Sequence, residues 1–290
     1  MVNWTLHSLE QHFSEVLSGL YDPSEAQSIC RLIAEDRLGW SRTRLLMDRD
    51  TTLTDTDTDP ILDCLPALQD GTPVQYLLGY AWFMELKLQV SPAVLIPRPE
   101  TEELVQRIAA DYAGAVGPLR ILDIGTGSGC IALGLKKLLP HAEVYALDIS
   151  GDALEIARAN ARTQALAVQF IQGDILEWDA FVDPAWRFDV VVSNPPYITQ
   201  AEAQAMHPNV LRHEPHLALF VENQAPLLFY AHIASFAARH LLPSGQVYAE
   251  INANLGCETA ELFRKKGFEP VVLHQDMQGK DRFVQARTGQ

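Results

Sequence analysis

The C-terminal part of the chain alternates between apolar segments of strand length and helical segments. From Leu119 onward, helical periodicity lies between the first five strand candidates. This alternation predicts parallel strands that are joined by crossover helices. Only the short segment DMQGK separates the last two candidates, so those strands must pair antiparallel. The sequence therefore predicts an α/β fold with a seven-stranded sheet that ends in a C-terminal antiparallel hairpin. The candidates are LRILDI, AEVYALDI, AVQFIQ, FDVVVSN, GQVYAEI, FEPVVLHQ and DRFVQAR.

The N-terminal part has the periodicity of helices. Apolar residues recur every three or four positions in residues 5–20 and again in 24–39, and Gly39 suits the C-terminal cap of the second helix. After the polar connector TDTDT, the segment DPILDCLPALQDG predicts a third helix, with Asp59 as its N-cap and Pro60 in its first turn. We therefore expect a small helical N-terminal domain.

A segment with strand periodicity connects these two parts. Apolar and polar residues alternate in YAWFMELKLQVSPAVLIPR, which predicts strands with a turn near Ser91–Pro92. Acidic residues directly after Pro99 favour the start of a helix there. The expected domains are a helical N-terminal domain that recognises a partner (1–78), a β-hairpin linker (79–98) and a third domain (99–290).

The charge of the chain argues against some classes of partner. Its formal net charge is −15, whereas a protein that binds nucleic acid needs clustered cations to replace phosphate counterions. Its apolar stretches are shorter than a membrane span, and its N-terminus lacks the pattern of a signal peptide. The four cysteines form no CxxC pair, which is typical of reduced thiols. We expect a cytoplasmic monomer without direct nucleic acid or membrane partners.

A glycine-rich loop follows the first strand of the predicted sheet. Glycines permit a sharp turn and let a ligand approach the backbone closely, and the next helix begins with free N–H groups. The spacing GxGxG differs from the GxGxxG of dinucleotide folds. A tight turn without a ligand is the alternative. The loop residues are Gly125, Thr126, Gly127, Ser128 and Gly129.

Acidic residues follow the next strands at the same predicted sheet edge. Asp148, before Ile149, is placed to accept hydrogen bonds from a ribose diol, although it also suits a helix N-cap. Asp174 is placed to accept from an adenine amino group beside Ile175, although a surface position is the alternative. Asp123 suits a cationic or amino-acid group. A ligand with adenine and ribose but no phosphate fits, and S-adenosylmethionine has these parts, with S-adenosylhomocysteine as its product.

The fourth strand ends in NPPY, beside the first strand. Asn194 offers a donor and an acceptor, and the carbonyl of Pro195 is a second acceptor. Two acceptors at a fixed distance match the two hydrogens of a planar –NH2 group, and Tyr197 adds a flat wall next to Pro196. Such a clamp can aim the nitrogen lone pair at a methyl sulfonium. A turn that only ends the strand is the alternative.

These motifs together resemble a known family. GTGSG and NPPY resemble class I S-adenosylmethionine-dependent methyltransferases with a Rossmann-like fold. GTPVQYLLG, LIPRPETEELV, HEPHLAL and QDMQGKDR narrow the resemblance to the HemK/PrmC type of protein-(glutamine-N5) methyltransferase. The resemblance covers residues 10–287. It implies that the chain methylates the glutamine of the GGQ motif in peptide chain release factors 1 and 2.

The resemblance also implies roles for individual residues. The glycine loop and Asp148 would hold the cofactor, and Asp174 and Ile175 would lie near its adenine. Asn194, Pro195 and Tyr197 would act as catalytic groups that grip the glutamine amide. Phe83, Arg98 and Glu100 would lie by the substrate cleft, although packing and helix capping are alternatives. Asn252 departs from the Glu-x-Gly of the family, which leaves the local loop shape open.

Other interpretations remain beside this one. A sister enzyme would methylate glutamine in a large-subunit ribosomal protein, and a DNA adenine methyltransferase would need a basic groove. A non-catalytic cofactor-binding module is a third possibility, against which an intact NPPY argues. His207, His213 and His216 predict a polar, substrate-facing loop and no metal site, because their spacing fits no closed set of ligands.

Overall fold

The computed structural model describes residues 3–115 and 117–289. The chain divides into two compact units. One consists of Met1–Gly79 with His207–His213, and the other of Tyr80–Met206 with Glu214–Gln290. No helix within the described residues is long and apolar enough to cross a membrane.

The first unit is built from short helices around an apolar core. Leu9, Phe13 and Ile33 are fully buried between the two longest helices. Gly39 ends the second helix with φ +64°, as the sequence predicts. The helices are α1 (Leu6–Val16), α2 (Pro23–Leu38), α3 (Arg42–Met47), α4 (Asp55–Leu62), α5 (Leu65–Gln69), α6 (Val74–Leu78) and α10 (Pro208–His213).

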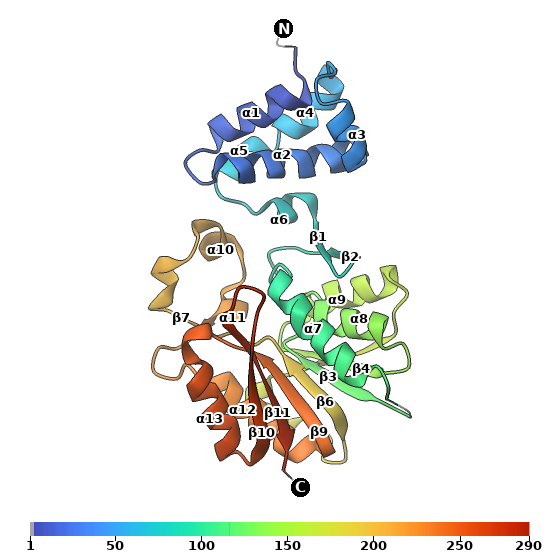
Figure 1. Cartoon of the computed structure of the whole chain (residues 1–290), viewed down its shortest axis with the longest axis vertical. Coiled ribbons are helices and arrows are strands. Elements are labelled where there is room, and N and C mark those ends of the chain that lie inside the picture. The colour runs from blue at the N-terminus through green and yellow to red at the C-terminus, as the bar shows by residue number, and fades with distance from the viewer. Residues whose placement is uncertain (1–2, 116, 290) are drawn as a thin grey trace. The chain divides into compact units, whose positions relative to one another are not determined.

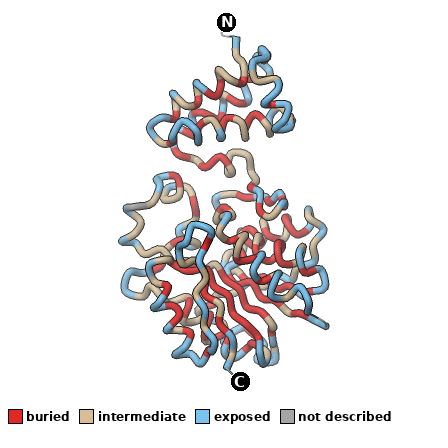
Figure 2. Tube along the Cα trace, in the orientation of Figure 1, coloured by how far each residue is buried: buried red, intermediate tan, exposed pale blue. Residues whose placement is uncertain are grey.

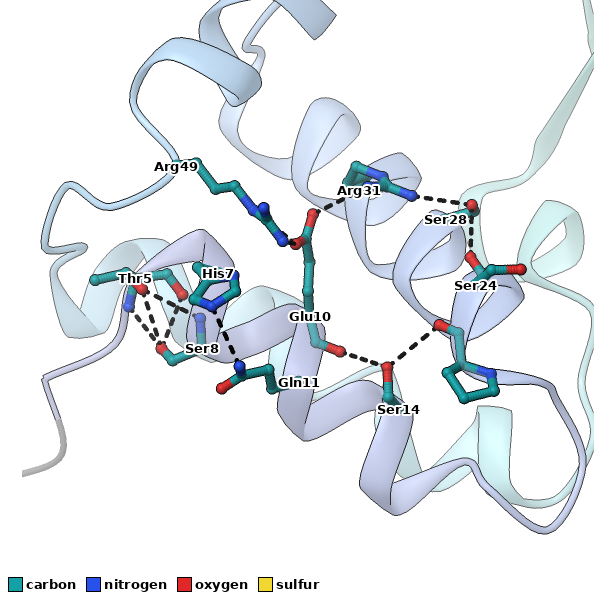
Figure 3. A network of polar contacts seen from close by, with 11 residues as sticks. Thr5, His7, Ser8, Glu10, Gln11, Ser14, Ser24, Ser28, Arg31 and Arg49 are labelled. Carbon is teal, nitrogen blue, oxygen red and sulfur yellow. Dashed lines mark hydrogen bonds and ion pairs between the residues drawn. The ribbon is translucent and has the colours of Figure 1, made fainter.

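A buried carboxylate lies within this first unit (Figure 3). The side chain of Glu10 on α1 is only 1% exposed, and it accepts hydrogen bonds from Arg49 Nε at 2.9 Å and Arg31 Nη1 at 3.4 Å. A charge that leaves water is tolerated only when it is paired in this way. The two arginines therefore join α1, α2 and the chain after α3 through one acidic side chain.

The third predicted helix begins earlier than the sequence suggested. Asp55 and Asp57 lie in the first turn of α4, where the helix dipole favours acids, and Asp57 accepts from the backbone N–H of Thr54 at 3.1 Å. The prediction of Asp59 as the N-cap is therefore wrong, and the TDTDT segment is helical and not a connector. Pro60 lies in the helix interior and not in its first turn.

α10 joins the first unit although it comes from a distant part of the sequence. His207 Nε2 donates to the carbonyl of Leu20 at 3.1 Å, and His213 Nε2 donates to the carbonyl of Asp70 at 3.2 Å. Asn209 donates to the hydroxyl of Tyr21. These long-range contacts explain why a sequence pattern did not reveal the position of this helix.

The second unit contains the predicted seven-stranded sheet (Figure 1). The strand order is β10-β11-β9-β6-β3-β4-β5, and β11 alone runs in the direction opposite to the other strands of this sheet. β6 pairs with β3, so the NPPY segment follows a strand next to the one that precedes the glycine loop. The strands are β3 (Arg120–Ile124), β4 (Glu143–Asp148), β5 (Val168–Gln172), β6 (Phe188–Ser193), β9 (Leu241–Glu250), β10 (Phe268–Gln275) and β11 (Asp281–Thr288).

Helices cover both faces of this sheet, and the strands are buried between them (Figure 2). Ile121, Val144 and Val190 pack toward α7 and α8, whereas the alternate residues Leu122 and Val191 pack toward α12 and α13. This alternation is the two-residue period of a strand that is buried on both faces. The helices are α7 (Pro99–Tyr112), α8 (Cys130–Leu138), α9 (Gly151–Thr163), η1 (Ile175–Ala180), α12 (Leu228–His240) and α13 (Gly256–Lys265).

The hairpin after the first unit turns at a different place from the one predicted. β1 (Tyr80–Phe83) and β2 (Leu86–Gln89) are joined at Met84 and Glu85, which have φ values of 48° and 61°. The Met84 N–H donates to the Glu102 carboxylate at 2.8 Å, and this contact holds the turn. The predicted turn near Ser91–Pro92 is also present, because the Val94 N–H donates to the Ser91 carbonyl at 3.0 Å, but this turn follows β2 and does not join the two strands.

Short elements complete the second unit beyond NPPY. β7 (Ile198–Thr199) pairs in parallel with β8 (Phe220–Val221) in a separate two-stranded sheet. The remaining elements are η2 (Glu202–Ala205), α11 (His216–Leu219) and η3 (Ala253–Leu255).

Candidate active site

A cavity of about 350 Å³ lies within the second unit, at the carboxyl ends of the parallel strands. This is the position at which open α/β sheets bind ligands. Its wall combines the glycine loop with the ends of β4, β5 and β6, and it continues to Val94 and Arg98 and to Leu217 on α11. Most of the cofactor and clamp residues predicted from the sequence line it: Gly125, Thr126, Gly127, Ser128, Asp148, Ile149, Asp174, Ile175, Asn194, Pro195 and Pro196.

The glycine loop requires its glycines for two reasons. Gly125, Gly127 and Gly129 have φ values of 72°, 54° and 83°, in the left-handed region that disfavours a side chain. At Gly129 an added Cβ would lie 3.3 Å from the Cβ of Ala157, so the loop also packs closely on α9. The loop therefore presents bare backbone to the cavity.

Asp148 is held in one orientation at the end of β4. Its Oδ2 accepts from the Gly127 N–H at 2.8 Å, and its Oδ1 accepts from the Ser150 N–H at 2.9 Å. Burial raises the pKa of this carboxyl, while those backbone hydrogen bonds oppose the rise. Ser150 caps α9, so Asp148 is not needed as the helix cap. Each carboxylate oxygen keeps a further lone pair for a ligand hydroxyl.

Asp123 lies beneath the glycine loop and not in the wall of the cavity. It is fully buried, and its Oδ2 accepts from the Thr126 hydroxyl at 2.6 Å. Its Oδ1 has no hydrogen-bond partner among the described residues. Burial raises the pKa of Asp123 to about 7. The side chain thus supports the loop from below, and its predicted contact with an amino-acid group stays a prediction.

Asp174 and two isoleucines form another part of the wall. Asp174 Oδ1 caps η1 by accepting from the Leu176 N–H at 2.8 Å. Ile149 is exposed into the site region, whereas Ile175 is buried. The Asp174 carboxylate and the apolar side chains of Ile149 and Ile175 thus line the same part of the cavity. This combination suits a planar ring that carries an exocyclic amino group.

The NPPY segment connects to a buried polar network. Asn194 Nδ2 donates to Thr101 Oγ1 at 3.3 Å, and the Thr101 hydroxyl donates to Glu250 Oε2 at 2.7 Å. The Tyr197 hydroxyl donates to Glu250 Oε1 at 3.0 Å. Tyr197 is therefore turned toward Glu250, and it is not among the residues that line the cavity. Burial and the charge of Glu250 raise the pKa of Tyr197.

The residues predicted beside the substrate cleft occupy different positions. Arg98 lines the cavity and forms an ion pair with the buried carboxylate of Glu214, which also accepts from the Ile96 N–H at 3.3 Å. Phe83 is 1% exposed in the core of the second unit, and Glu100 is half-buried in the first turn of α7. Neither Phe83 nor Glu100 lines the cavity. Phe83 occupies a packing position and Glu100 a position at the helix start, which are the alternatives given for these residues.

Thr101, which lines the cavity, and Glu250, to which its hydroxyl donates, are two polar residues that the sequence interpretation missed. Glu250 ends β9, next to β6, so it carries the same signal as Asp148: an acidic residue at the carboxyl end of a parallel strand. Thr101 had no comparable signal, because the first turn of a helix often contains a hydroxyl residue.

The histidines after NPPY do not converge. The rings of His207 and His213 contact backbone carbonyls of the first unit, and His216 packs edge-on against Phe220. Among the described residues, no three His, Cys, Asp or Glu side chains are grouped so that they could hold a metal ion.

Most of the chain is similar to known methyltransferases. The family model described as "Methyltransferase small domain" matches residues 101–217, and the one described as "PrmC N-terminal domain" matches residues 8–79. The release factor glutamine methyltransferase of Flavobacterium psychrophilum is 42% identical over 94% of this chain and 95% of its own length. The protein of the same name from Bacteroides thetaiotaomicron is 39% identical over 97% of this chain and 99% of its own length.

A solved structure is also similar in fold. The crystal structure of a methyltransferase from Pyrococcus furiosus has a TM-score of 0.52 and 20% sequence identity, and the match covers 71% of this chain and 91% of the other. At that identity the similarity concerns the fold alone.

Proposed function

This chain belongs to the release factor glutamine methyltransferase family, and on that premise we propose that it methylates the side-chain nitrogen N5 of a glutamine in peptide chain release factors 1 and 2. The proposed methyl donor is S-adenosylmethionine, and the proposed glutamine is that of the GGQ motif. The observation that carries the proposal is the position of NPP beside the glycine loop and Asp148 in one cavity.

The residues of the cavity fit this methyl donor. When bound, S-adenosylmethionine supplies a methyl group on a positively charged sulfur. The oriented carboxylate of Asp148 suits a ribose diol, and Asp174 with Ile149 and Ile175 suits an adenine. The bare backbone of the glycine loop admits a ligand without contact with a Cβ.

The proposed role of NPPY is to hold the glutamine amide. An amide nitrogen is a poor nucleophile because its lone pair is delocalised into the carbonyl. Asn194 Oδ1 and the Pro195 carbonyl would accept the two N–H groups, and this favours a pyramidal nitrogen whose lone pair points at the methyl group. Tyr197, fixed by Glu250, would support this segment from behind.

The domain roles follow from the same proposal. The N-terminal domain, residues 1–78, would dock the release factor, and residues 79–98 would link it to the methyltransferase domain, residues 99–290. A net charge of −15 suits a protein partner better than a nucleic acid.

Radiolabelled methyl transfer tests the proposal. Purified release factor should accept the label, whereas its variant with the GGQ glutamine replaced by alanine should not. A large-subunit ribosomal protein and duplex DNA serve as parallel substrates. Label on either of these, or equal label on the alanine variant, would contradict the proposed substrate.

A further inference from the structure

We propose that Glu250 is a positioning residue that acts through Thr101 to hold the side-chain amide of Asn194 in one of its two orientations, with the oxygen toward the cavity. The inference rests on the proposed function, because the orientation matters only if Asn194 binds an amino group.

Three elements bring this network together. Glu250 is the last residue of β9, Thr101 lies in the first turn of α7, and Asn194 follows β6. Ser193 pairs with Ala249, so the ends of the two strands carry Asn194 and Glu250 side by side. Glu250 and Thr101 are each only 2% exposed, so water does not compete for their hydrogen bonds.

The direction of each hydrogen bond follows from the chemistry of the groups. Burial raises the pKa of Glu250, and the hydrogen bonds from Thr101 and Tyr197 oppose this rise. In its carboxylate form Glu250 can only accept, so Thr101 and Tyr197 both donate their single hydroxyl proton to it. The Thr101 oxygen, whose proton is committed, can then only accept at its contact with Asn194. The Asn194 atom at 3.3 Å must therefore be the nitrogen, and the amide oxygen is left for the cavity that Asn194 lines.

The opposite orientation would be inactive in the proposed clamp. It would turn the Asn194 –NH2 toward the –NH2 of the substrate, and two donors cannot bond to each other. The proton of Thr101, which is donated to Glu250, is what selects between the two ends of the amide. The negative charge on Glu250 thus determines which end of Asn194 the substrate meets.

Replacing the carboxylate by an amide of the same shape tests this reasoning. In Glu250→Gln, the Tyr197 hydroxyl can donate to the new amide oxygen, and the new –NH2 then faces Thr101. The Thr101 proton becomes available to donate to Asn194, which reverses the preferred amide orientation. Thr101→Val removes the hydroxyl that connects Glu250 to Asn194, whereas Thr101→Ser keeps a hydroxyl at this position.

The assay measures kcat and KM for release factor and the affinity for S-adenosylhomocysteine. Glu250→Gln should lower kcat by about 100-fold, the loss that follows removal of one oriented polar contact in a transition state. Thr101→Val should lower kcat by less, because the Asn194 amide can then take either orientation. Affinity for S-adenosylhomocysteine should stay at the wild-type level, and Thr101→Ser should recover most of kcat. Thr259→Val is the matched control, because Thr259 in α13 is also fully buried and its hydroxyl donates to the carbonyl of Leu255, which precedes this helix, at 2.7 Å.

The outcomes separate the two proposals. A wild-type protein that transfers no methyl group to release factor would refute the proposed function. If the wild type is active and the kcat of Thr101→Val equals that of Thr259→Val, then Glu250 does not act on Asn194 through Thr101. If thermal unfolding shows that Glu250→Gln does not fold, the comparison of Thr101→Val with Thr101→Ser tests the positioning role without that variant.

Discussion

Replacement of Asn194 by alanine is the most direct perturbation of the proposed clamp. The change removes the oxygen that faces the cavity and also the nitrogen that donates to Thr101 at 3.3 Å. The lost internal hydrogen bond is long and partly buried, and Thr101 keeps its bond to Glu250. We therefore expect the free energy of unfolding to fall by only about 0.5–1 kcal/mol.

The effect on methyl transfer should be much larger. Loss of one oriented acceptor at a reacting group costs about 3–4 kcal/mol, or about 10²–10³-fold in rate. Single-turnover transfer to release factor at saturating S-adenosylmethionine measures this step directly. Calorimetric titration with S-adenosylhomocysteine is the control, and it should give wild-type affinity because the glycine loop and Asp148 are unchanged. A single-turnover rate within about threefold of wild type would show that Asn194 does not hold the reacting amide.

Three further predictions concern carboxylate side chains. Asp148→Asn should weaken S-adenosylhomocysteine binding by about 10–100-fold in calorimetric titration, because a charge-assisted acceptor for the ribose is lost; an unchanged affinity would contradict the ribose role. Glu10→Gln should lower the free energy of unfolding of the first unit by about 1–2 kcal/mol in urea. The loss is smaller than for a fully buried ion pair, because Arg31 and Arg49 are each 38% exposed and can turn to water. An unchanged urea midpoint would show that these ion pairs do not contribute to stability. Burial raises the pKa of Asp123 to about 7, above its value in the unfolded chain. The folded state then binds more protons than the unfolded state, so ionisation of Asp123 lowers stability as the pH rises from about 4 to 7. Asp123→Asn cannot ionise, so its stability relative to wild type should increase over this range in urea titrations at several pH values, and a constant difference would contradict the shift.

Local patterns were sufficient to predict the sheet. The strands of the second unit are apolar runs of strand length, and the helical segments between them predicted the parallel pairing. The short DMQGK segment predicted the final antiparallel pairing. The hairpin turn was not predictable in this way. Met84 and Glu85 adopt positive φ values that normally indicate glycine. The Met84 N–H is held by the carboxylate of Glu102, which lies outside the hairpin sequence.

In the candidate site, too, local patterns predicted some features, whereas others depend on contacts between residues far apart in the sequence. The sequence indicated which strand ends carry polar groups, and the structure brings Asp148, Asp174 and Asn194 to one cavity. It did not indicate that Asp123 supports the loop from below, because burial depends on the packing of α8 over the strand. Thr101 was equally hidden, because its partner Glu250 is 149 residues away in the chain.

The assignment of α10 to the first unit limits how far that unit can be treated as a module. The chain leaves the second unit after Met206 and returns at Glu214, so the helical unit is discontinuous in sequence. At Gly71, a Cβ would lie 2.9 Å from the side-chain oxygen of Asn209, which shows how closely the inserted helix fits. A chimera that exchanges residues 1–79 with those of a relative must therefore exchange residues 207–213 as well, or the grafted helices will meet an α10 whose side chains fit a different surface.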